Sequence, residues 1–124
     1  MKCFDTSALM EMATESPLIA PYLTGGFIIT DLTLVEFCGV ILMRYNEQTS
    51  DYWFKKLQPH AHALPQELLY EAVKFRWKQK HGKMSFPDAV AYIFARKQGC
   101  TLVTTDNDFK HLPGVDLVQG KEKK

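Results

Sequence analysis

The stretch that decides the fold is LVTTDNDF, Leu102 to Phe109. Apolar and β-branched residues typical of a buried strand run directly into a turn that carries Asp106 and Asp108. Asp and Asn are ordinary turn formers, because their side chains bond to the local backbone. The same arrangement could instead hold carboxylates at a strand end, where their oxygens suit a hard divalent cation. The positions of the other acids in the chain must decide between the two interpretations.

The composition is that of a folded protein. The chain has 124 residues, of which 46% are hydrophobic and 23% are charged, close to the averages for globular domains. We expect one domain over residues 1–119 and a basic, frayed tail over residues 120–124. The formal net charge of +1 provides no general attraction for nucleic acid, so such binding would need a local basic patch.

The cysteines predict a reducing environment. Cys3, Cys38 and Cys100 lie in apolar runs without a C-x-x-C pair, and their odd number argues against a disulfide framework.

The first ten residues do not resemble a signal peptide. The longest nearly apolar window, residues 32–43, contains Glu36 and is shorter than the roughly 20 residues of a membrane span. We therefore expect a cytoplasmic protein with no membrane role.

Strand and helix patterns alternate along the chain. Residue types and turn signals predict strands at residues 2–4, 27–30, 60–64, 101–105 and 115–118. The spacing of apolar residues predicts helices at residues 6–15, 33–46, 49–59, 66–82 and 85–99, with a further short helix punctuated by Pro17 and Pro21. This alternation predicts an α/β fold in which helices cover both faces of a central, mainly parallel sheet of about five short strands. Ligands bind beyond the carboxyl ends of such strands.

Asp5 and Glu36 are the first two candidate acids along the chain. Asp5 follows the first strand and could simply cap the next helix. Glu36 lies in LVEFCGVILM, where apolar residues surround the helix on nearly every side, so we expect that helix to be buried and its carboxylate to need a partner. Thr33-x-x-Glu36 also has the spacing of a capping box, which would satisfy the acid locally.

The later acids have similar alternatives. Ser85-x-x-Asp88 is a second capping-box spacing, and Asp106 and Asp108 could both serve the turn. Local roles of this kind explain each acid separately, but they do not explain why all the acids would converge. Two unit charges about 4 Å apart repel by roughly 4 kcal/mol at an effective dielectric near 20. A multivalent cation would remove that repulsion, so converging acids would favour a metal site.

Four motifs in this order give the chain a family resemblance. They are FDTSAL at residues 4–9, Glu36 in TLVEF, the Asp-Ala helix start at Asp88, and the T-x-D-x-D-F turn at residues 104–109. The last two belong to one long block from Ser85 to Val118. The chain resembles the PIN-domain family, and within it the small single-domain ribonucleases typified by VapC-type toxins. The resemblance implies a three-layer α/β/α sandwich and spans nearly the whole chain, although residues 46–82 carry no family motif.

The resemblance also implies an activity and its residues. Asp5, Glu36, Asp88 and Asp106 correspond to the catalytic acids of the family; Asp5, Asp88, Asp106 and Asp108 would bind one or two Mg²⁺ or Mn²⁺ ions. Glu36 would orient or deprotonate the attacking water. The implied function is a metal-dependent endoribonuclease acting as the toxin of a toxin–antitoxin pair, with an RNA substrate, an antitoxin partner and a homodimeric state. The alternative is a non-cleaving RNA- or protein-binding module that uses the acidic pocket for docking.

The segment KFRWKQKHGK, residues 74–83, is basic throughout. If it is helical, Arg76, Lys80 and Lys83 share one face and could bind the RNA backbone, although a solvated helix face explains the same pattern. Trp77 is expected to pack against the protein. Thr6 and Thr104 are further candidates for binding water or phosphate, with a structural role as the alternative.

Overall fold

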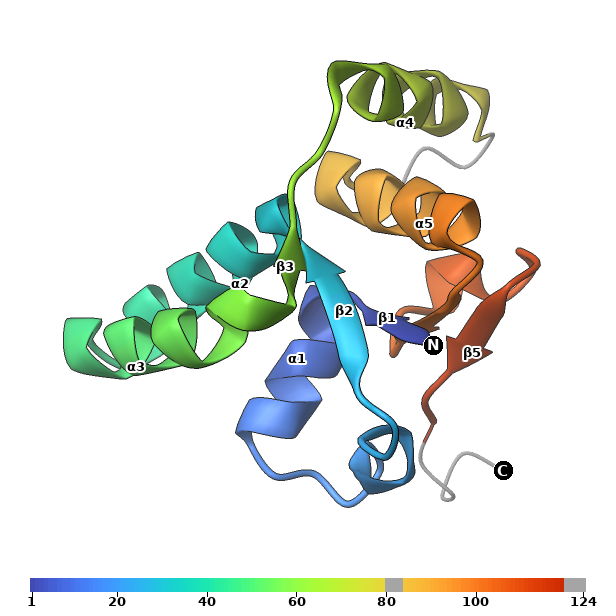
Figure 1. Ribbon diagram of the computed structural model, residues 1–124. Coiled ribbons are helices and arrows are strands. Elements are labelled where there is room, and N and C mark those ends of the chain that lie inside the picture. The colour runs from blue at the N-terminus through green and yellow to red at the C-terminus, as the bar shows by residue number, and fades with distance from the viewer. Residues whose placement is uncertain (80–83, 120–124) are drawn as a thin grey trace.

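A parallel sheet forms the centre of the molecule (Figure 1). The computed structural model describes residues 1–79 and 84–119. The sheet has five strands, β1 (Lys2–Phe4), β2 (Phe27–Thr30), β3 (Ala61–His62), β4 (Thr101–Thr104) and β5 (Val115–Leu117), in the order β3-β2-β1-β4-β5. Every neighbouring pair is parallel. The predicted α/β fold is confirmed, although β3 has only two residues where five were expected.

Helices cover both faces of the sheet (Figure 1). The helices α1 (Thr6–Ala13), α2 (Asp31–Arg44) and α3 (Glu47–Leu57) contribute to one apolar core, while α4 (Gln66–Lys78) and α5 (Phe86–Gln98) contribute to the other. Three short 3₁₀ turns complete the described elements: η1 (Ala20–Tyr22), η2 (Gln58–His60) and η3 (Asn107–Phe109). The predicted short helix near Pro21 is thus a 3₁₀ turn. The result is a three-layer α/β/α sandwich.

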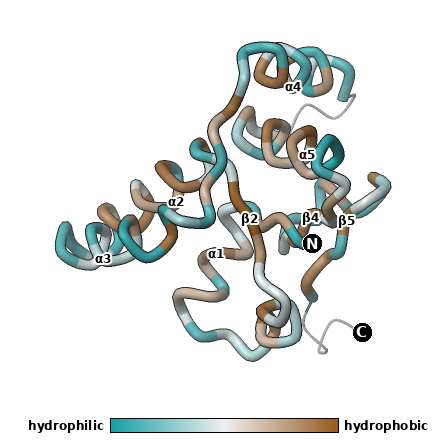
Figure 2. The backbone as a smooth tube through the Cα atoms, viewed as in Figure 1, coloured by the Kyte–Doolittle hydropathy of each residue, from teal (hydrophilic) through white to brown (hydrophobic). Residues whose placement is uncertain are grey.

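Successive strand residues enter opposite cores, as the pleat of a strand requires. Cys3 and Leu102 pack in the core beneath α4 and α5, whereas their neighbours Phe4 and Val103 pack in the core beneath α1 and α2. In α5, the whole run Ala89–Ala95 is buried, and the tube through this part of the helix is correspondingly apolar (Figure 2). The central strands are therefore apolar on both faces, which leaves their ends as the places for polar side chains.

Helix α2 differs from the sequence prediction in its start and in its burial. It begins at Asp31 because Thr30 is its N-cap and accepts a hydrogen bond from the Thr33 backbone N–H at 2.9 Å. The expectation that α2 is buried on all sides is wrong, since Val35 and Met43 are exposed. Helix α2 therefore lies at the surface and carries apolar residues on its exposed face as well as on its buried face.

Helix α4 is shorter than predicted. It ends at Lys78, and the backbone of Gln79 is extended, with φ −74° and ψ 121°. Lys80 and Lys83 lie outside the described residues, so the expectation that they share a helical face with Arg76 stays a prediction. Trp77 was expected to pack, but 81% of it is exposed. The apolar run of a single sequence does not reveal which side of an outer helix has a neighbour.

In the two described parts of the chain, no helix combines the length and the apolar character that crossing a membrane requires.

Candidate active site

Asp5 anchors the site at the carboxyl end of β1. Its side chain is buried and caps α1 by accepting a hydrogen bond from the Ala8 backbone N–H at 2.9 Å. The capping role proposed from sequence is therefore real. Both carboxylate oxygens accept further hydrogen bonds, one from Ser7 Oγ at 2.7 Å and the other from Thr104 Oγ1, so capping accounts for only part of the environment of this acid.

Ser7 and Thr104 connect the ends of β1 and β4. Ser7 Oγ accepts a hydrogen bond from the Thr105 backbone N–H at 2.9 Å while it donates to Asp5. Thr104 is fully buried and its hydroxyl donates to Asp5, which agrees with the structural alternative for this residue. Its role in substrate binding stays a prediction. Ser7 was not among the residues predicted from sequence. The signal available was its place two residues after a strand-end acid, but the contact depends on β4 lying beside β1.

Glu36 reaches the same region from the second turn of α2. Thr6 Oγ1 donates a hydrogen bond to Glu36 Oε1. The alternative that Glu36 completes a capping box with Thr33 is wrong, because Thr30 occupies the N-cap position. Thr6 therefore positions the Glu36 carboxylate, and the partner that a half-buried acid needs comes from another helix.

Asp88 lies in the first turn of α5, close to the other acids. Its backbone N–H donates to Ser85 Oγ at 3.3 Å, which is half of a capping box. The pKa of the Asp88 carboxyl is raised to about 7, first by burial and then by the negative charges of Asp5, Asp106 and Glu36, against a lowering effect of the Ser85 hydroxyl. Such charge effects act over short range, so the three other acids lie near Asp88.

Asp106 and Asp108 occupy the turn after β4. Asp106 caps η3 by accepting from the Asp108 backbone N–H at 2.9 Å, and its own N–H donates to Thr104 Oγ1 at 3.0 Å. Burial is the first cause of the raised pKa of Asp5, hydrogen bonds oppose it, and the charge of Asp106 adds to it. Within residues 1–79 and 84–119, no hydrogen bond joins the Asp108 carboxylate to this group.

The structure thus gathers four of the predicted acids. Asp5, Glu36, Asp88 and Asp106 come from the end of β1, from α2, from the start of α5 and from the turn after β4. We refer to these four residues as the acid cluster. The caps and the cluster coexist, because the starts of α1 and α5 and the ends of β1 and β4 meet at one edge of the sheet.

The comparison with known families agrees with this arrangement. The family model of the PIN domain matches residues 2–115. This chain belongs to the PIN-domain family. No curated protein matches the sequence.

Solved structures share the PIN fold at low sequence identity. A toxin–antitoxin complex from Klebsiella pneumoniae matches at 20% identity with a TM-score of 0.75, covering 96% of this chain and 98% of the other. VapC20 of Mycobacterium tuberculosis, a toxin that cleaves the sarcin–ricin loop, matches at 14% identity with a TM-score of 0.80, covering 96% and 100%. DNA-bound VapBC from Salmonella typhimurium matches at 15% identity with a TM-score of 0.70, covering 94% and 95%. At these identities the comparisons establish the shared fold.

The acid cluster of this PIN domain suits a hard cation by its chemistry. All four donors are carboxylates, the ligands that Mg²⁺ and Mn²⁺ prefer. Their mutual repulsion, expressed in the raised pKa of Asp88, is the effect that a bound cation reverses. The described residues do not hold three or more His, Cys, Asp or Glu side chains already arranged around one point. Binding would therefore draw the carboxylates closer together.

The predicted basic contacts have different outcomes. Arg76 Nε donates to the Met84 backbone carbonyl at 2.7 Å, so part of its guanidinium joins the end of α4 to the segment before α5. Lys80 and Lys83 lie outside the described residues. Their role in substrate binding stays a prediction.

Proposed function

We propose that this PIN domain is a metal-dependent endoribonuclease, and that it is the toxin of a toxin–antitoxin pair. The observation that carries the proposal is the convergence of four acids from distant parts of the chain, Asp5, Glu36, Asp88 and Asp106, which lie near enough for their charges to act on Asp88. Family membership and the structural likeness to a toxin–antitoxin complex support the same function.

Asp5, Asp88 and Asp106 are the residues that would hold Mg²⁺ or Mn²⁺, with Asp108 reaching it through water. When bound, one or two such ions polarise a phosphoryl oxygen and lower the pKa of a bound water. The chain contributes the positions of the carboxylates. Ser7 and Thr104 fix Asp5 through hydrogen bonds, and the helix start at Ser85 fixes Asp88.

Glu36 would orient and deprotonate the attacking water. The Thr6 hydroxyl holds one of its oxygens, which leaves the other carboxylate oxygen for the water. A positioned carboxylate can act as a general base in this way. Asp88 must be ionised to bind a cation, so a pKa of about 7 makes metal loading release a proton near neutral pH.

The partners of this function are an RNA substrate and an antitoxin protein. The neighbours include a toxin–antitoxin complex and a DNA-bound VapBC complex, which supports an antitoxin for this chain. Three free, buried cysteines suit the reducing cytoplasm in which such a protein would act.

Cleavage of structured RNA oligonucleotides tests the proposal. The wild-type chain, assayed with Mn²⁺ and with excess chelator, should cleave only with the metal. Asp5→Asn should lose at least about a hundredfold in rate, since asparagine keeps the helix cap but removes the charge. Asp51→Asn, an exposed acid in α3, serves as the matched control and should cleave as the wild type does.

Two outcomes would contradict the nuclease. Equal cleavage by the wild type and Asp5→Asn would identify a contaminating enzyme. Absence of metal-dependent cleavage, together with binding of RNA or a basic peptide that Asp5→Asn weakens, would favour the non-cleaving docking module.

A further inference from the structure

A cavity of about 410 Å³ lies between the end of β3, the start of α4 and the last turns of α5. We call this cavity the β3 pocket. Its floor includes the buried side chains of Leu68 and Phe94. Its rim carries four polar or charged side chains, those of His62, Glu67, Lys97 and Gln98. An apolar floor with a few polar groups at the edge, in a volume of roughly 300–1,000 Å³, is typical of small-molecule sites.

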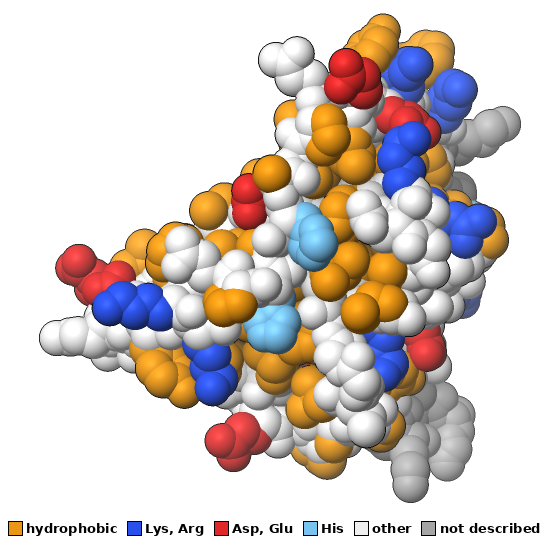
Figure 3. Space-filling view, viewed as in Figure 1, with side chains coloured by type: hydrophobic (Ala, Val, Ile, Leu, Met, Phe, Trp, Pro, Cys, Tyr) orange, Lys and Arg blue, Asp and Glu red, His pale blue; other side chains and the backbone are white. Residues whose placement is uncertain are grey.

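His62 forms an aromatic wall of the β3 pocket. Its ring centroid lies 5.6 Å from that of Phe94, at an interplanar angle of 52°. Phe94 is almost fully buried, so it supports the exposed His62 ring from the protein side. Figure 3 shows histidine side chains at the surface near β3, with hydrophobic side chains beside them. An exposed flat ring that is held in this way suits stacking with a nucleobase.

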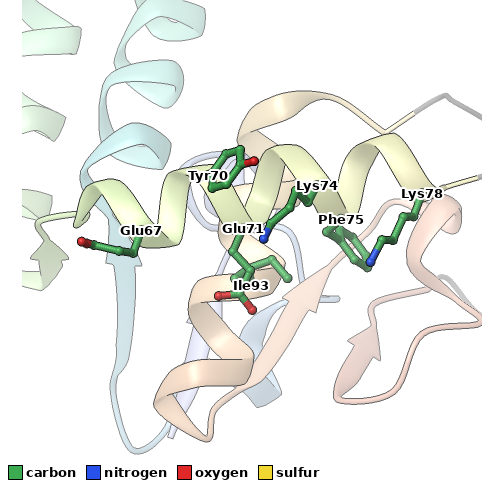
Figure 4. Close-up of a pocket in the computed structure, with 7 residues that line it drawn as sticks. All are labelled: Glu67, Tyr70, Glu71, Lys74, Phe75, Lys78 and Ile93. Atoms are coloured by element: carbon green, nitrogen blue, oxygen red, sulfur yellow. The ribbon is translucent and has the colours of Figure 1, made fainter.

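Glu67 and Lys97 place a carboxylate and an ammonium group at the rim. Glu67 is exposed in the first turn of α4, and Figure 4 shows its carboxylate pointing away from Lys74 and Lys78, which line the adjoining groove of about 570 Å³. Glu71 holds the Lys97 ammonium at 3.0 Å, and this contact uses one of its three N–H donors. The rim therefore offers a negatively charged acceptor together with free donors.

Guanine is the base whose hydrogen-bonding edge matches this rim. Its Watson–Crick edge carries the O6 acceptor followed by two adjacent donors, N1–H and the N2 amino group. The Glu67 carboxylate can accept from both donors at once, while Lys97 donates to O6. Adenine, cytosine and uracil have no two adjacent donors on this edge, so a carboxylate can bind each of them through only one hydrogen bond.

The two charges of the rim distinguish a guanine base from other occupants. An arginine side chain of a peptide also bonds to a carboxylate through two N–H groups and stacks on aromatic rings, but Lys97 would repel this cation. A bare phosphate would be repelled in turn by Glu67. A neutral base that presents one acceptor and two donors is favourable for both charges.

The β3 pocket and the acid cluster lie on the same face of the sheet. Phe4 and Ala61 pack in the core beneath α1 and α2. The residues that follow them, Asp5 and His62, therefore point to the opposite face, as the alternation along a strand requires. This is the face that α5 covers (Figure 1).

The strand register gives the distance between the two sites. The Cys3–Ile28 pair places Asp5 two residues further along, level with the last residue of β2. That residue, Thr30, pairs with His62. Because β1 and β3 are separated by β2 alone, Asp5 and His62 lie about 10 Å apart along the edge of the sheet.

Helix α5 spans the same distance. Asp88 lies near Asp5, and Phe94 contacts His62. The six residues from Asp88 to Phe94 cover about 9 Å of helix, in agreement with the strand spacing. A single-stranded RNA with a phosphate at the acid cluster can therefore place a base a few nucleotides away in the β3 pocket, since stacked nucleotides rise about 3.4 Å each.

We propose that the β3 pocket binds a guanine base of the RNA substrate and thereby selects the phosphate that is cut. His62 stacks on the base, Glu67 accepts from N1–H and the N2 amino group, and Lys97 donates to O6. The selection of a phosphate rests on the proposed nuclease function, whereas the binding of guanine does not require it.

Binding of RNA to the metal-free full chain tests the pocket. A labelled single-stranded RNA with one guanine among uridines should bind about tenfold more tightly than the same RNA with inosine, which lacks the N2 amino group. Glu67→Gln should reduce this difference to less than about twofold. His62→Ala should weaken both RNAs about tenfold through lost stacking. Glu47→Gln on α3 is the matched control and should keep the wild-type difference.

Cleavage with Mn²⁺ tests the link between the pocket and the acid cluster. When the guanine is moved along the RNA, the wild type should move its cut by the same number of nucleotides. Glu67→Gln should still cleave, because it keeps the acid cluster, but its cuts should no longer follow the guanine. A general fault in folding would instead lower cleavage at every position.

Several results would overturn the proposal. Equal binding of the guanine and inosine RNAs by the wild type, or a difference that Glu67→Gln leaves intact, would show that the pocket does not read guanine. Guanosine monophosphate that binds as tightly as the guanine RNA, with cuts that ignore the guanine, would assign the pocket to a free nucleotide. Tighter binding of an arginine-containing peptide, lost in Glu67→Gln, would assign it to a basic partner.

The two experiments separate this inference from the nuclease. Guanine-dependent binding without cleavage would retain the guanine site and contradict the nuclease. Metal-dependent cleavage at positions unrelated to guanine would retain the nuclease and contradict the selection of the cut by the β3 pocket.

Discussion

Helix α5 contains two regions with opposite physical characters. Its first turn carries Asp88, whose carboxyl is held near three other acids and has its pKa raised to about 7. The following run, Ala89–Ala95, is buried and belongs largely to the core beneath α4. The run stabilises the fold through apolar burial, whereas the first turn places like charges together at a cost. The buried run holds the first turn of α5 in position, and the packing of that run does not depend on the acids. The fold can therefore maintain a site at which like charges repel.

The contrast predicts that the buried run controls stability. Phe94 is almost completely buried, so Phe94→Ala should lower the free energy of unfolding by about 3–5 kcal/mol through lost burial and a cavity. Chemical denaturation of the metal-free protein measures this change. Phe94→Leu is the matched control and should lose about half as much or less. An Ala variant within about 1 kcal/mol of the wild type would mean that the core tolerates the cavity and that the buried run does not control stability.

The first turn should control activity without supporting the fold. Asp88→Asn removes a proposed cation ligand, so we expect cleavage with Mn²⁺ to fall about 10²–10³-fold, comparable to the loss of other electrostatic groups in active sites. The metal-free variant should be at least as stable as the wild type at pH 7.5, because a repelling charge is gone. Cleavage rates and denaturation curves test the two halves separately. A variant that loses stability and activity together would erase the distinction between the regions.

The turn at Pro113–Gly114 packs against the carboxyl-terminal half of α5 and requires glycine. Gly114 has φ +78°, and a Cβ at this position would collide with the Arg96 side chain. The Tyr92 hydroxyl donates to the adjacent Pro113 carbonyl at 2.8 Å. Gly114→Ala should therefore cost about 1–3 kcal/mol of stability from backbone strain and the contact.

Gly39 provides the control for this substitution. It lies within α2, and a Cβ there would meet nothing within 4 Å. Gly39→Ala should be neutral or stabilise the protein by up to about 1 kcal/mol. Equal effects of the two substitutions in thermal unfolding would show that the turn at Pro113–Gly114 does not fasten α5.

The raised pKa values predict a modest pH dependence of the metal-free protein. The Asp88 pKa is 3.8 ordinarily and about 7 in the fold, so between these values the folded state keeps a proton that the unfolded state has lost. Stability should be greatest below about pH 4 for this group and should fall as the pH rises to about 7. Because Asp88 is partly exposed, we expect only a few degrees in Tm. Asp88→Asn should flatten the profile, and an unchanged profile would contradict the pKa.

Much of the fold follows from the sequence because the local patterns agree with the tertiary structure. The strand ends at Asp5 and Asp106, the cap at Ser85 and the stop at Gly99 all lie where residue chemistry indicates. The five strands alternate with helices as the periodicity predicts, so the layered sheet follows. Convergence of the acids could be expected from parallel strands, whose carboxyl ends meet at one edge.

The parts that sequence reasoning missed depend on neighbours far away in the chain. Ser7 joins Thr105 only because β4 lies beside β1. Glu36 looked able to bond within its own helix, but Thr30 took the cap and Thr6 became its partner. Trp77 looked like a core residue because aromatic residues usually pack, yet no described element covers it. In each case the outcome depends on which other element of the fold lies next to the side chain, and the local sequence does not show that.

The most direct test of the central claim is a calorimetric Mn²⁺ titration of the wild type, Asp5→Asn, Asp88→Asn and the double variant at pH 6.5. If the acids form one cation site, the wild type should bind with proton release. Each single variant should bind at least about tenfold more weakly, and the double variant should lose much less than the sum of the two losses, because the site is already broken. Wild-type affinity in both single variants, or losses that simply add, would contradict a shared site.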